Sequence, residues 1–344
     1  MRNIQYILLL SLLAFTSSCV GQKEPASNFS VTISASQPNI SVDNGESVRL
    51  SVKNHSIDVT DQAEIYYTQS GEEVLVEGGV FVATQSGEYT FGARYSGVES
   101  DGHAVVYAYT EDQLSTEFYR RNIVMKFTGT WCVNCPAMGT AITDVEHSMP
   151  NRIVEISMHC YDELTVSEST QVASDNSFSV LPITFVDMLS STSTSSASII
   201  TSLINNSIDT NPTTAGVKIA SEIDGSTLNV TVGVKSNTSN NYKIAVALVV
   251  DNYNYAQTGA DDPNYKQNKV LRFYLSELYG DSLGTIAANG EIIRNYTAVL
   301  PSEALESESR VVAYVLNEVN GKYIVNNASE CVIGNSIDYM YEIN

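Results

Sequence analysis

The sequence predicts a multidomain, β-rich protein in which one α/β domain lies between two β-sandwiches. Residues 30–108 contain short apolar runs of period two, separated by Gly, Asn and Asp turns. Near residue 130, an apolar strand leads into two cysteines and a helical pattern, which is typical of a βα unit. From residue 212 onward, the period-two alternation returns. We therefore expect domains at residues 30–108, 111–211 and 212–344.

Residues 1–18 have the pattern of a signal peptide. Arg2 precedes an apolar run that is too short to span a bilayer, and small residues then lead to Cys19. These small residues resemble a bacterial lipobox, which implies that Cys19 becomes the lipidated first residue of the mature chain. The alternative is an ordinary secretory signal with a cysteine nearby. Val20, rather than Asp, follows Cys19, and by resemblance to Gram-negative sorting signals this implies the outer membrane, with residues 19–29 as a tether.

Composition excludes several kinds of partner. A formal net charge of −21 argues against binding to nucleic acid or to an anionic membrane surface.

Apart from Cys19, the cysteines are Cys132, Cys135, Cys160 and Cys331, and in an oxidising compartment all four could be paired. The sequence contains no phosphate loop, Ser–His–Asp set or paired carboxylates, so we predict no cofactor. It indicates no oligomeric state.

Residues 30–108 predict an immunoglobulin-like β-sandwich without a disulfide. Strands are expected around residues 31–33, 48–52, 80–82 and 89–91. The run from Ser86 to Phe91 resembles the tyrosine corner of immunoglobulin domains, with Phe91 where antibody domains place a cysteine. We interpret this domain as a spacer. A ligand-binding role is the alternative, although nothing in its loops indicates a ligand.

The α/β domain, at residues 111–211, is organised around a Cys-X-X-Cys motif. The apolar strand at residues 123–127 is followed by Trp131, Cys132 and Cys135, with a helix expected over residues 134–148. Unpaired N–H groups and the dipole at a helix N-terminus favour an anion, so a cysteine there can ionise. Half of a zinc site looks similar, but no second Cys or His pair stands at metal spacing, so we predict no metal.

This arrangement resembles thioredoxin, in which a tryptophan precedes the first cysteine. Fifty residues later, Pro182 opens an apolar strand in the manner of the thioredoxin cis-proline. Such a proline would place the backbone of Leu181 against the disulfide and hold a partner chain as an added strand. Further elements are expected as a strand at 153–158, helices at 166–175 and 197–208, and a Ser/Thr-rich loop at 190–198. No last strand is evident between residue 186 and the closing helix.

Lys126 stands where thioredoxins carry a buried aspartate that assists proton transfer. A buried ammonium would have a lowered pKa, whereas a partly solvated one near the dithiol would stabilise the Cys132 thiolate. The alternative is that Lys126 points away from the motif. In each case the usual general base is missing.

Three interpretations compete for Cys160 and Cys331. They either pair with each other, joining the second domain to the third, or remain as buried free thiols. In the third interpretation, His159 and Cys160 contribute to a metal or redox site. The sequence does not decide between them.

Residues 212–344 predict a second β-sandwich. Strands are expected at residues 228–234, 242–250, 310–316 and 323–325. Residues 251–281 form a long insertion that carries Tyr253, Tyr255, Tyr265, Tyr274 and Tyr279. Loops of this length are often functional, and exposed tyrosines suit recognition. The alternative is a self-packed irregular segment.

From residue 111 to the end, the chain resembles the 28-kilodalton outer-membrane-protein family of Gram-negative anaerobes. The resemblance is carried by Phe127 to Pro136, by residues 268–272 with 280–284, and by Leu316 to Glu318 through Gly334. It implies an envelope lipoprotein with a thioredoxin-like domain, preceded here by an accessory module.

Two hypotheses follow. In the first, the protein is a thiol–disulfide oxidoreductase acting on envelope proteins: Cys132 attacks, Cys135 resolves, Pro182 holds the partner chain and Trp131 shields the pair. In the second, Cys132–Cys135 is an inert disulfide in a binding or structural lipoprotein, because a fold does not by itself imply function.

Overall fold

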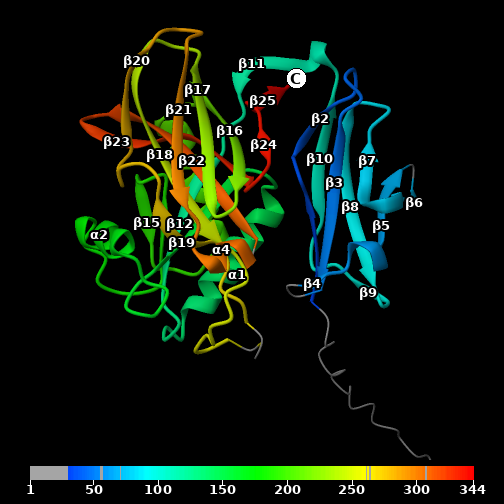
Figure 1. Ribbon diagram of the computed structural model, residues 1–344, viewed down its shortest axis with the longest axis horizontal. Helices are drawn as coiled ribbons and strands as arrows, with labels where there is room; N and C mark the ends of the chain where they lie inside the picture. The colour runs from blue at the N-terminus through cyan, green and yellow to red at the C-terminus, as the bar shows by residue number, and fades with distance from the viewer. Residues whose placement is uncertain (1–29, 55–56, 70, 261, 263–264, 307) are drawn as a thin grey trace, which may run out of the picture.

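The computed structural model describes residues 30–54, 57–69, 71–260, 262, 265–306 and 308–344 (Figure 1). These residues form a front β-sandwich, drawn in blue and cyan, and a larger body beside it. Lys53 of the front sandwich pairs with Glu308 of the body. The predicted signal peptide, tether and Cys19 lie outside the described residues. No helix in the described part of the chain is both long and apolar enough to cross a membrane.

The front sandwich consists of two sheets around one apolar core. One sheet contains β1 (Val31–Ala35), β3 (Ser47–Asn54), β4 (Ile57–Asp58) and β7 (Val80–Val82). The other contains β2 (Asn39–Ser41), β5 (Glu64–Gln69), β6 (Glu72–Leu75), β8 (Gly87–Tyr95), β9 (Val98–Glu99) and β10 (Ala104–Tyr109). Short 3-10 turns are η1 (Thr60–Gln62), η2 (Glu77–Gly79) and η3 (Glu111–Gln113). Alternate residues of β3 point into the core against Phe91, as the period-two pattern requires. The four predicted strands are all present.

The body is built on one nine-stranded sheet. Its strands are β12 (Asn122–Thr128), β13 (Ile153–His159), β14 (Ile183–Val186), β15 (Ser190–Thr192), β18 (Asn240–Val250), β19 (Val270–Tyr274), β20 (Asp281–Ile286), β22 (Ser309–Val319) and β23 (Lys322–Val332). Their order is β15-β14-β12-β13-β19-β18-β22-β23, with β20 beside β18. Every residue of β13 is buried, which suits a strand covered on both faces.

The α/β half of this sheet has a short, defined topology. Strands β12 and β13 are parallel and joined by α1 (Cys135–Ser148), while β14 and β15 are antiparallel. Helices α1 and α3 (Ala197–Thr210) pack on one face through Met138, Ile142 and Ile200. Helix α2 (Ser167–Asp175) packs on the other face. The prediction of a Ser/Thr-rich loop at 190–198, with no last strand after residue 186, was partly wrong, because residues 190–192 form the short strand β15.

The sheet continues across the boundary predicted at residue 212. Strand β19, which lies inside the expected insertion, pairs with β13 at Ser157↔Val270 and with β18 on its other side. An apolar core common to both halves contains Phe127 and Ile156 together with Ala247 and Val312. Residues 111–211 and 212–344 therefore share one sheet and one core.

A second sheet covers the C-terminal half of the first. It contains β16 (Ala215–Asp224), β17 (Thr227–Ser236), β21 (Glu291–Val299) and β24 (Ser336–Ile337). Val217, Val230 and Val232 of this sheet pack on Val246 and Val311 of the large sheet. Between the front sandwich and the body, β11 (Leu114–Phe118) pairs with β25 (Tyr341–Ile343). The short helix α4 (Ser302–Glu306) precedes β22 in the chain. The four strands predicted here correspond to β17, β18, β22 and β23.

Candidate functional site: a covered disulfide at the start of a helix

The Cys-X-X-Cys motif lies between the end of β12 and the start of α1. We call residues 129–134 the CxxC loop. Two backbone hydrogen bonds shape it: Cys132 N donates to Gly129 O (2.9 Å), and Cys135 N donates to Cys132 O (3.3 Å). Cys132 and Cys135 form a disulfide, with their Cα atoms 5.4 Å apart. The helix starts at Cys135, one residue after the predicted start.

The start of α1 creates a local electrostatic environment that favours negative charge. Pro136 occupies the first turn of α1, where its missing N–H leaves no intrahelical bond unmade. The first turn contains no acidic side chain. The positive end of the helix dipole is therefore not neutralised locally, and it favours a thiolate on a reduced cysteine at this point.

The predicted cis-proline is confirmed, since the Leu181–Pro182 peptide is cis. Pro182 precedes β14, in which Ile183 pairs with Phe127 of β12. This register places Pro182 beside the carboxyl end of β12, where the CxxC loop begins. The cis peptide and the register of β14 are therefore as expected, whereas the contact of the Leu181 backbone with the disulfide and the role of Pro182 in holding a partner stay predictions.

Exposed apolar side chains border the motif. Trp131 is 50% exposed, and its indole Nε1 donates to Cys160 O (3.2 Å). Val133, Tyr161 and Val180 are exposed at 62%, 74% and 61%. We call these four residues the apolar rim. Trp131 and Val133 belong to the CxxC loop, Tyr161 follows β13, and Val180 lies two residues before Pro182. Exposed apolar side chains that lie together on a surface are typical of contact with a polypeptide.

Residues 159–162 support the CxxC loop from β13. Asp162 Oδ2 accepts hydrogen bonds from Thr130 N (2.8 Å) and is 2.7 Å from His159 Nδ1. Burial alone would raise the pKa of Asp162, but the hydrogen bonds and charge of its partners hold that pKa below its ordinary value. His159 Nε2 is buried without a hydrogen-bond partner in the described part of the chain. Asp162 was not singled out from the sequence, because a lone aspartate carries no motif.

The interpretation of Cys160 and Cys331 as buried free thiols matches the structure. Cys160 belongs to the core under α2, whereas Cys331 belongs to the core between the two sheets of the body. Burial raises the pKa of each thiol to about 11. Among the described residues, no three His, Cys, Asp or Glu side chains are placed to hold a metal ion.

Lys126 is buried in an ion pair. Its Nζ lies 2.7 Å from Glu155 Oε1 of the neighbouring strand, and its side chain is 12% exposed. The lowered pKa expected for a buried lysine was wrong: burial acts to lower the pKa, but Glu155 outweighs it, so the pKa is raised.

A segment that the sequence analysis did not assign to the site crosses the CxxC loop. Gln257 Nε2 donates to Gly129 O (3.1 Å) and to Cys132 O (3.0 Å). Thr258 N donates to Thr130 O (2.8 Å). The disulfide below is almost shielded from solvent, with Cys132 and Cys135 exposed at 4% and 3%. The only signal in the sequence was the length of the insertion.

The tyrosines of the insertion mostly pack within the protein. Tyr274 Oη lies 3.0 Å from Tyr314 Oη, and Tyr279 Oη donates to Asp175 Oδ2 (2.5 Å). Tyr253 packs beside Tyr255, with the Arg272 guanidinium over its ring. Only Tyr255, at 38%, is among the large exposed apolar residues. The self-packed alternative therefore describes this segment better than an array of exposed tyrosines.

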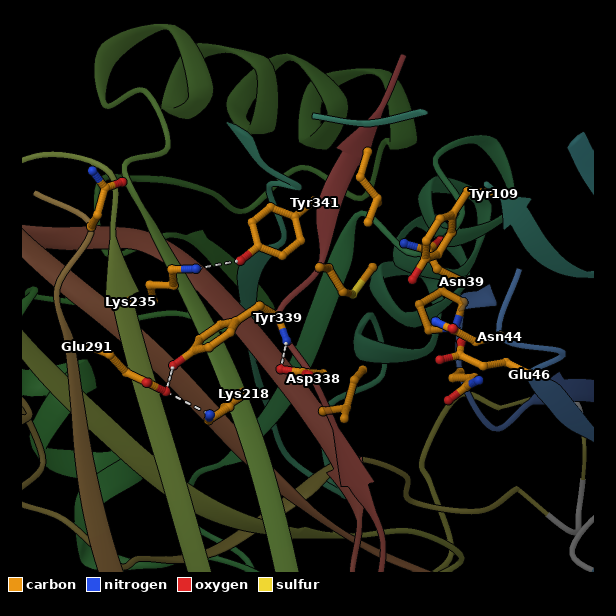
Figure 2. Close-up of a pocket in the computed structure, with 16 residues that line it drawn as sticks. Asn39, Asn44, Glu46, Tyr109, Lys218, Lys235, Glu291, Asp338, Tyr339 and Tyr341 are labelled. Atoms are coloured by element: carbon orange, nitrogen blue, oxygen red, sulfur yellow. Dashed lines mark hydrogen bonds and ion pairs between the residues drawn. The ribbon is translucent and has the colours of Figure 1, made fainter. Parts of the chain in front are cut away.

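A cavity of about 580 Å³ lies elsewhere, between the front sandwich and the body (Figure 2). It is lined by Asn39, Glu46 and Tyr109 on one side and by Lys218, Glu291 and Tyr339 on the other. Glu291 accepts from Tyr339 Oη (2.8 Å) and pairs with Lys218 (2.7 Å). Lys218, Glu291 and Tyr339 thus already satisfy one another, and no CxxC loop residue lines the cavity. We therefore place the candidate site at the disulfide.

Comparison with known proteins gives a family and a fold. Residues 171–336 match the family described as outer membrane protein Omp28. HBP35 of Porphyromonas gingivalis is structurally similar, with a TM-score of 0.54 and 18% identity over 64% of this chain and 77% of that one. Protein AGR_C_4864 from Agrobacterium tumefaciens matches 64% of this chain and 97% of its own at 14% identity, but its TM-score of 0.41 is too low to support an argument. No curated protein sequence matches the chain.

Proposed function

We propose that this protein is an envelope lipoprotein whose thioredoxin-like domain exchanges disulfides with other envelope proteins, and the match of residues 171–336 to the Omp28 family supports its place in the envelope. The observation that carries the proposal is the Cys132–Cys135 disulfide at the start of α1, in a fold that also has a cis Leu181–Pro182 peptide directly before β14. The matched family region begins after both cysteines. The family match therefore supports a location in the outer membrane, but it gives no support for a reaction at the cysteines.

The proposed reaction oxidises a partner dithiol. A partner thiolate attacks Cys132 Sγ, the Cys132–Cys135 bond breaks, and Cys135 leaves as a thiolate that takes a proton. A second partner thiolate then attacks the partner sulfur of the mixed disulfide and releases Cys132. Two electrons pass from the partner, which gains a disulfide, to the cysteine pair. The reverse sequence, starting with a Cys132 thiolate, reduces a partner disulfide.

The apolar rim supports a polypeptide as the partner. Trp131 and Val133 flank the first cysteine, while Tyr161 and Val180 come from two neighbouring segments of the fold. An extended chain binding along the backbone before Pro182 would cover this rim and bring a cysteine toward the disulfide. Catalytic roles are thus proposed for Cys132 and Cys135, with Pro182 and Trp131 in supporting ones.

One observation favours a second candidate, an inert structural disulfide in a binding or structural lipoprotein. Both cysteines are almost fully buried, whereas exchange needs an accessible sulfur. The two candidates predict different reduction potentials. An exchanging pair should equilibrate with glutathione at roughly −120 to −270 mV, and a structural disulfide should lie below about −300 mV.

Trapping provides the decisive experiment. In a Cys135→Ser variant, Cys132 has no resolving partner, so mixed disulfides with envelope proteins should accumulate and disappear on reduction. The matched control is Cys132→Ser with Cys135→Ser, which should trap none. A folded Cys135→Ser variant without adducts, together with a potential below about −300 mV, would rule out exchange.

We also propose that the protein is anchored in the outer membrane by lipid on Cys19. The support is the lipobox-like sequence before Cys19 and the match of residues 171–336 to a family of outer membrane proteins. The Cys19→Ser variant cannot be lipidated at this position, so cell fractionation should find it in the soluble fraction and not in the membrane fraction. Retention in the membrane would contradict the anchor.

We assign the front sandwich as an immunoglobulin-like spacer. Its support is the Tyr89 hydroxyl, which donates to Gln85 O (3.0 Å), four residues upstream, as in a tyrosine corner. Phe91 is fully buried in the core, at the position where antibody domains carry a cysteine. Deleting this sandwich should leave the potential of the disulfide unchanged if it is only a spacer.

A further inference from the structure

We propose that residues 253–259 form an autoinhibitory strap, held by Gln257, which must be displaced before the Cys132–Cys135 disulfide can react. The biological meaning of this inference rests on the proposed exchange function. The physical claim does not, because the strap can be tested with a small thiol in place of a protein partner.

Gln257 is the main attachment of the strap to the CxxC loop. Its amide nitrogen lies within hydrogen-bond distance of two loop carbonyls, Gly129 O and Cys132 O. Only 9% of Gln257 is exposed. A buried amide with these contacts fixes the peptide groups on both sides of Trp131, and so fixes the segment that carries the first cysteine.

Gln267 holds Gln257 in place. Gln267 Nε2 donates to Gln257 Oε1 (3.0 Å), which leaves the Gln257 amide nitrogen facing the CxxC loop. Gln267 is itself 4% exposed, and its backbone forms an isolated antiparallel bridge with Tyr253. The two glutamines thus connect the base of the strap to the loop over the disulfide.

The strap also approaches the loop through its backbone. Thr258 N donates to Thr130 O (2.8 Å). Gly259 follows with φ +81°, and a Cβ atom there would lie 2.3 Å from Val133 O. Only glycine fits both the left-handed conformation and this contact. The strap therefore lies directly on the loop that a partner would have to reach.

The attachment is polar and local, which is the basis for regarding the strap as displaceable. Tyr253 packs against the body at its base, but beyond it Asn254 and Tyr255 are exposed. Segments with few buried apolar contacts open at a small fraction of the global free energy of unfolding. Hydrogen bonds to the carbonyls of Gly129 and Cys132 can be replaced by water once the strap has moved.

The experiment measures how fast dithiothreitol reduces the disulfide in the full-length oxidised protein in detergent. One dithiothreitol thiolate attacks a protein sulfur and releases the other cysteine. The second thiolate then closes the cyclic oxidised reagent and releases the remaining cysteine. Acid quenching, alkylation and peptide mass spectrometry report the alkylated fraction of Cys132 and Cys135 over time.

Two variants should release the strap by different means. Gln257→Ala removes the two side-chain hydrogen bonds to the loop, and Gly259→Ala forces the strap away from Val133. Each should accelerate reduction about tenfold, the effect of losing roughly one net hydrogen bond from the closed state. The matched control is Gln171→Ala, because Gln171 is exposed on α2 and bonds to Asp175; its rate should equal that of the unaltered protein.

Circular dichroism and thermal unfolding separate release of the strap from global unfolding. Folded Gln257→Ala and Gly259→Ala variants that are reduced at the unaltered rate would overturn the proposal. So would an equal acceleration in Gln171→Ala. If the two strap variants are reduced faster but the Cys135→Ser variant traps no partners, the strap proposal is supported and the exchange function is rejected.

Discussion

The two ends of β12 are both tied to later parts of the chain, but by different kinds of contact. At its amino end, the buried carboxylate of Asp187 accepts from Arg120 (2.8 Å), Asn122 (2.5 Å), Ser207 (2.6 Å) and Ile123 N (2.7 Å). At its carboxyl end, the CxxC loop is held by Gln257 and Thr258. The first contact set is ionic and closed to water, whereas the second is neutral and near the surface.

The difference shows which attachment is permanent. Arg120 also donates to Val325 O (2.9 Å), and Val325 N donates to Asp187 O (3.0 Å), so β23 is fixed to the start of β12. Removing one partner there leaves a buried charge unpaired. Opening the strap exposes only amides and carbonyls, which water can satisfy. One end is thus suited to holding the two halves of the body together, and the other to opening.

The largest expected effect is at the amino end. Asp187→Ala leaves the Arg120 guanidinium buried without its carboxylate, so the free energy of unfolding should fall by about 3–5 kcal/mol. Chemical denaturation of the oxidised protein measures this loss. The control is Asp209→Ala, an exposed position on α3, which should stay within about 0.5 kcal/mol of the unaltered protein. A loss below about 1 kcal/mol at Asp187 would remove the distinction between the two ends.

The charge of Glu330 should make the amino-end attachment sensitive to acid. Glu330 pairs with Arg121 (3.0 Å) and Lys269 (3.6 Å). Burial acts to raise its pKa, but Lys269, Arg310 and Arg121 outweigh burial and lower the pKa to about 2. Because the folded-state pKa lies below the unfolded value, its stabilisation is full above pH 5 and is lost as the pH falls toward 2.

Comparison with Glu330→Gln isolates this contribution. The unaltered protein should exceed the variant in free energy of unfolding by roughly 3 kcal/mol at pH 7, and the gap should shrink near pH 3. Denaturant titrations at both pH values measure it, with Glu222→Gln at an exposed site as the control. A gap that does not change with pH would show that the ionised carboxylate is not what stabilises this end.

The sequence predicted the local elements of both ends better than their long-range contacts. The strand before the motif, helix α1 and the cis peptide before Pro182 all follow from local patterns. Strand β19 was missed because its short apolar run lies inside a polar, tyrosine-rich segment. Its place between β13 and β18 depends on pairing with β13, which lies more than 100 residues earlier in the chain. Local periodicity carries no such information.

The polar contacts were missed for a related reason. Asp187 and Gln257 are single residues without a motif, and each is important only because several distant groups converge on it. The boundary predicted at residue 212 rests on the return of period-two alternation, which carries no information about which regions share a core. In the structure Phe127 and Val312 belong to one core, so the regions on the two sides of residue 212 stabilise each other.

A smaller effect is expected at the carboxyl end. Gln257→Ala should lower the free energy of unfolding by about 1 kcal/mol, the net contribution of a hydrogen bond. The two carbonyls keep other partners, since Cys132 N donates to Gly129 O and Cys135 N donates to Cys132 O. Denaturation of the oxidised variant measures the loss. A cost as large as that of Asp187→Ala would show that the strap belongs to the permanent structure and does not open separately.

The smallest expected effect concerns the free thiols, and it tests how far opening extends. Cys160 and Cys331 are buried, and burial raises the pKa of each to about 11, so at neutral pH both are protonated and shielded. Iodoacetamide should leave both unlabelled in the folded protein and label both after denaturation, as read by peptide mass spectrometry. The same should hold for Gln257→Ala, because Cys160 lies under α2 and its carbonyl still accepts the Trp131 indole. Labelling of Cys160 in the folded variant would mean that the strap and the end of β13 open together. Of the two attachments, only the contacts of Asp187 at the amino end of β12 would then stay closed.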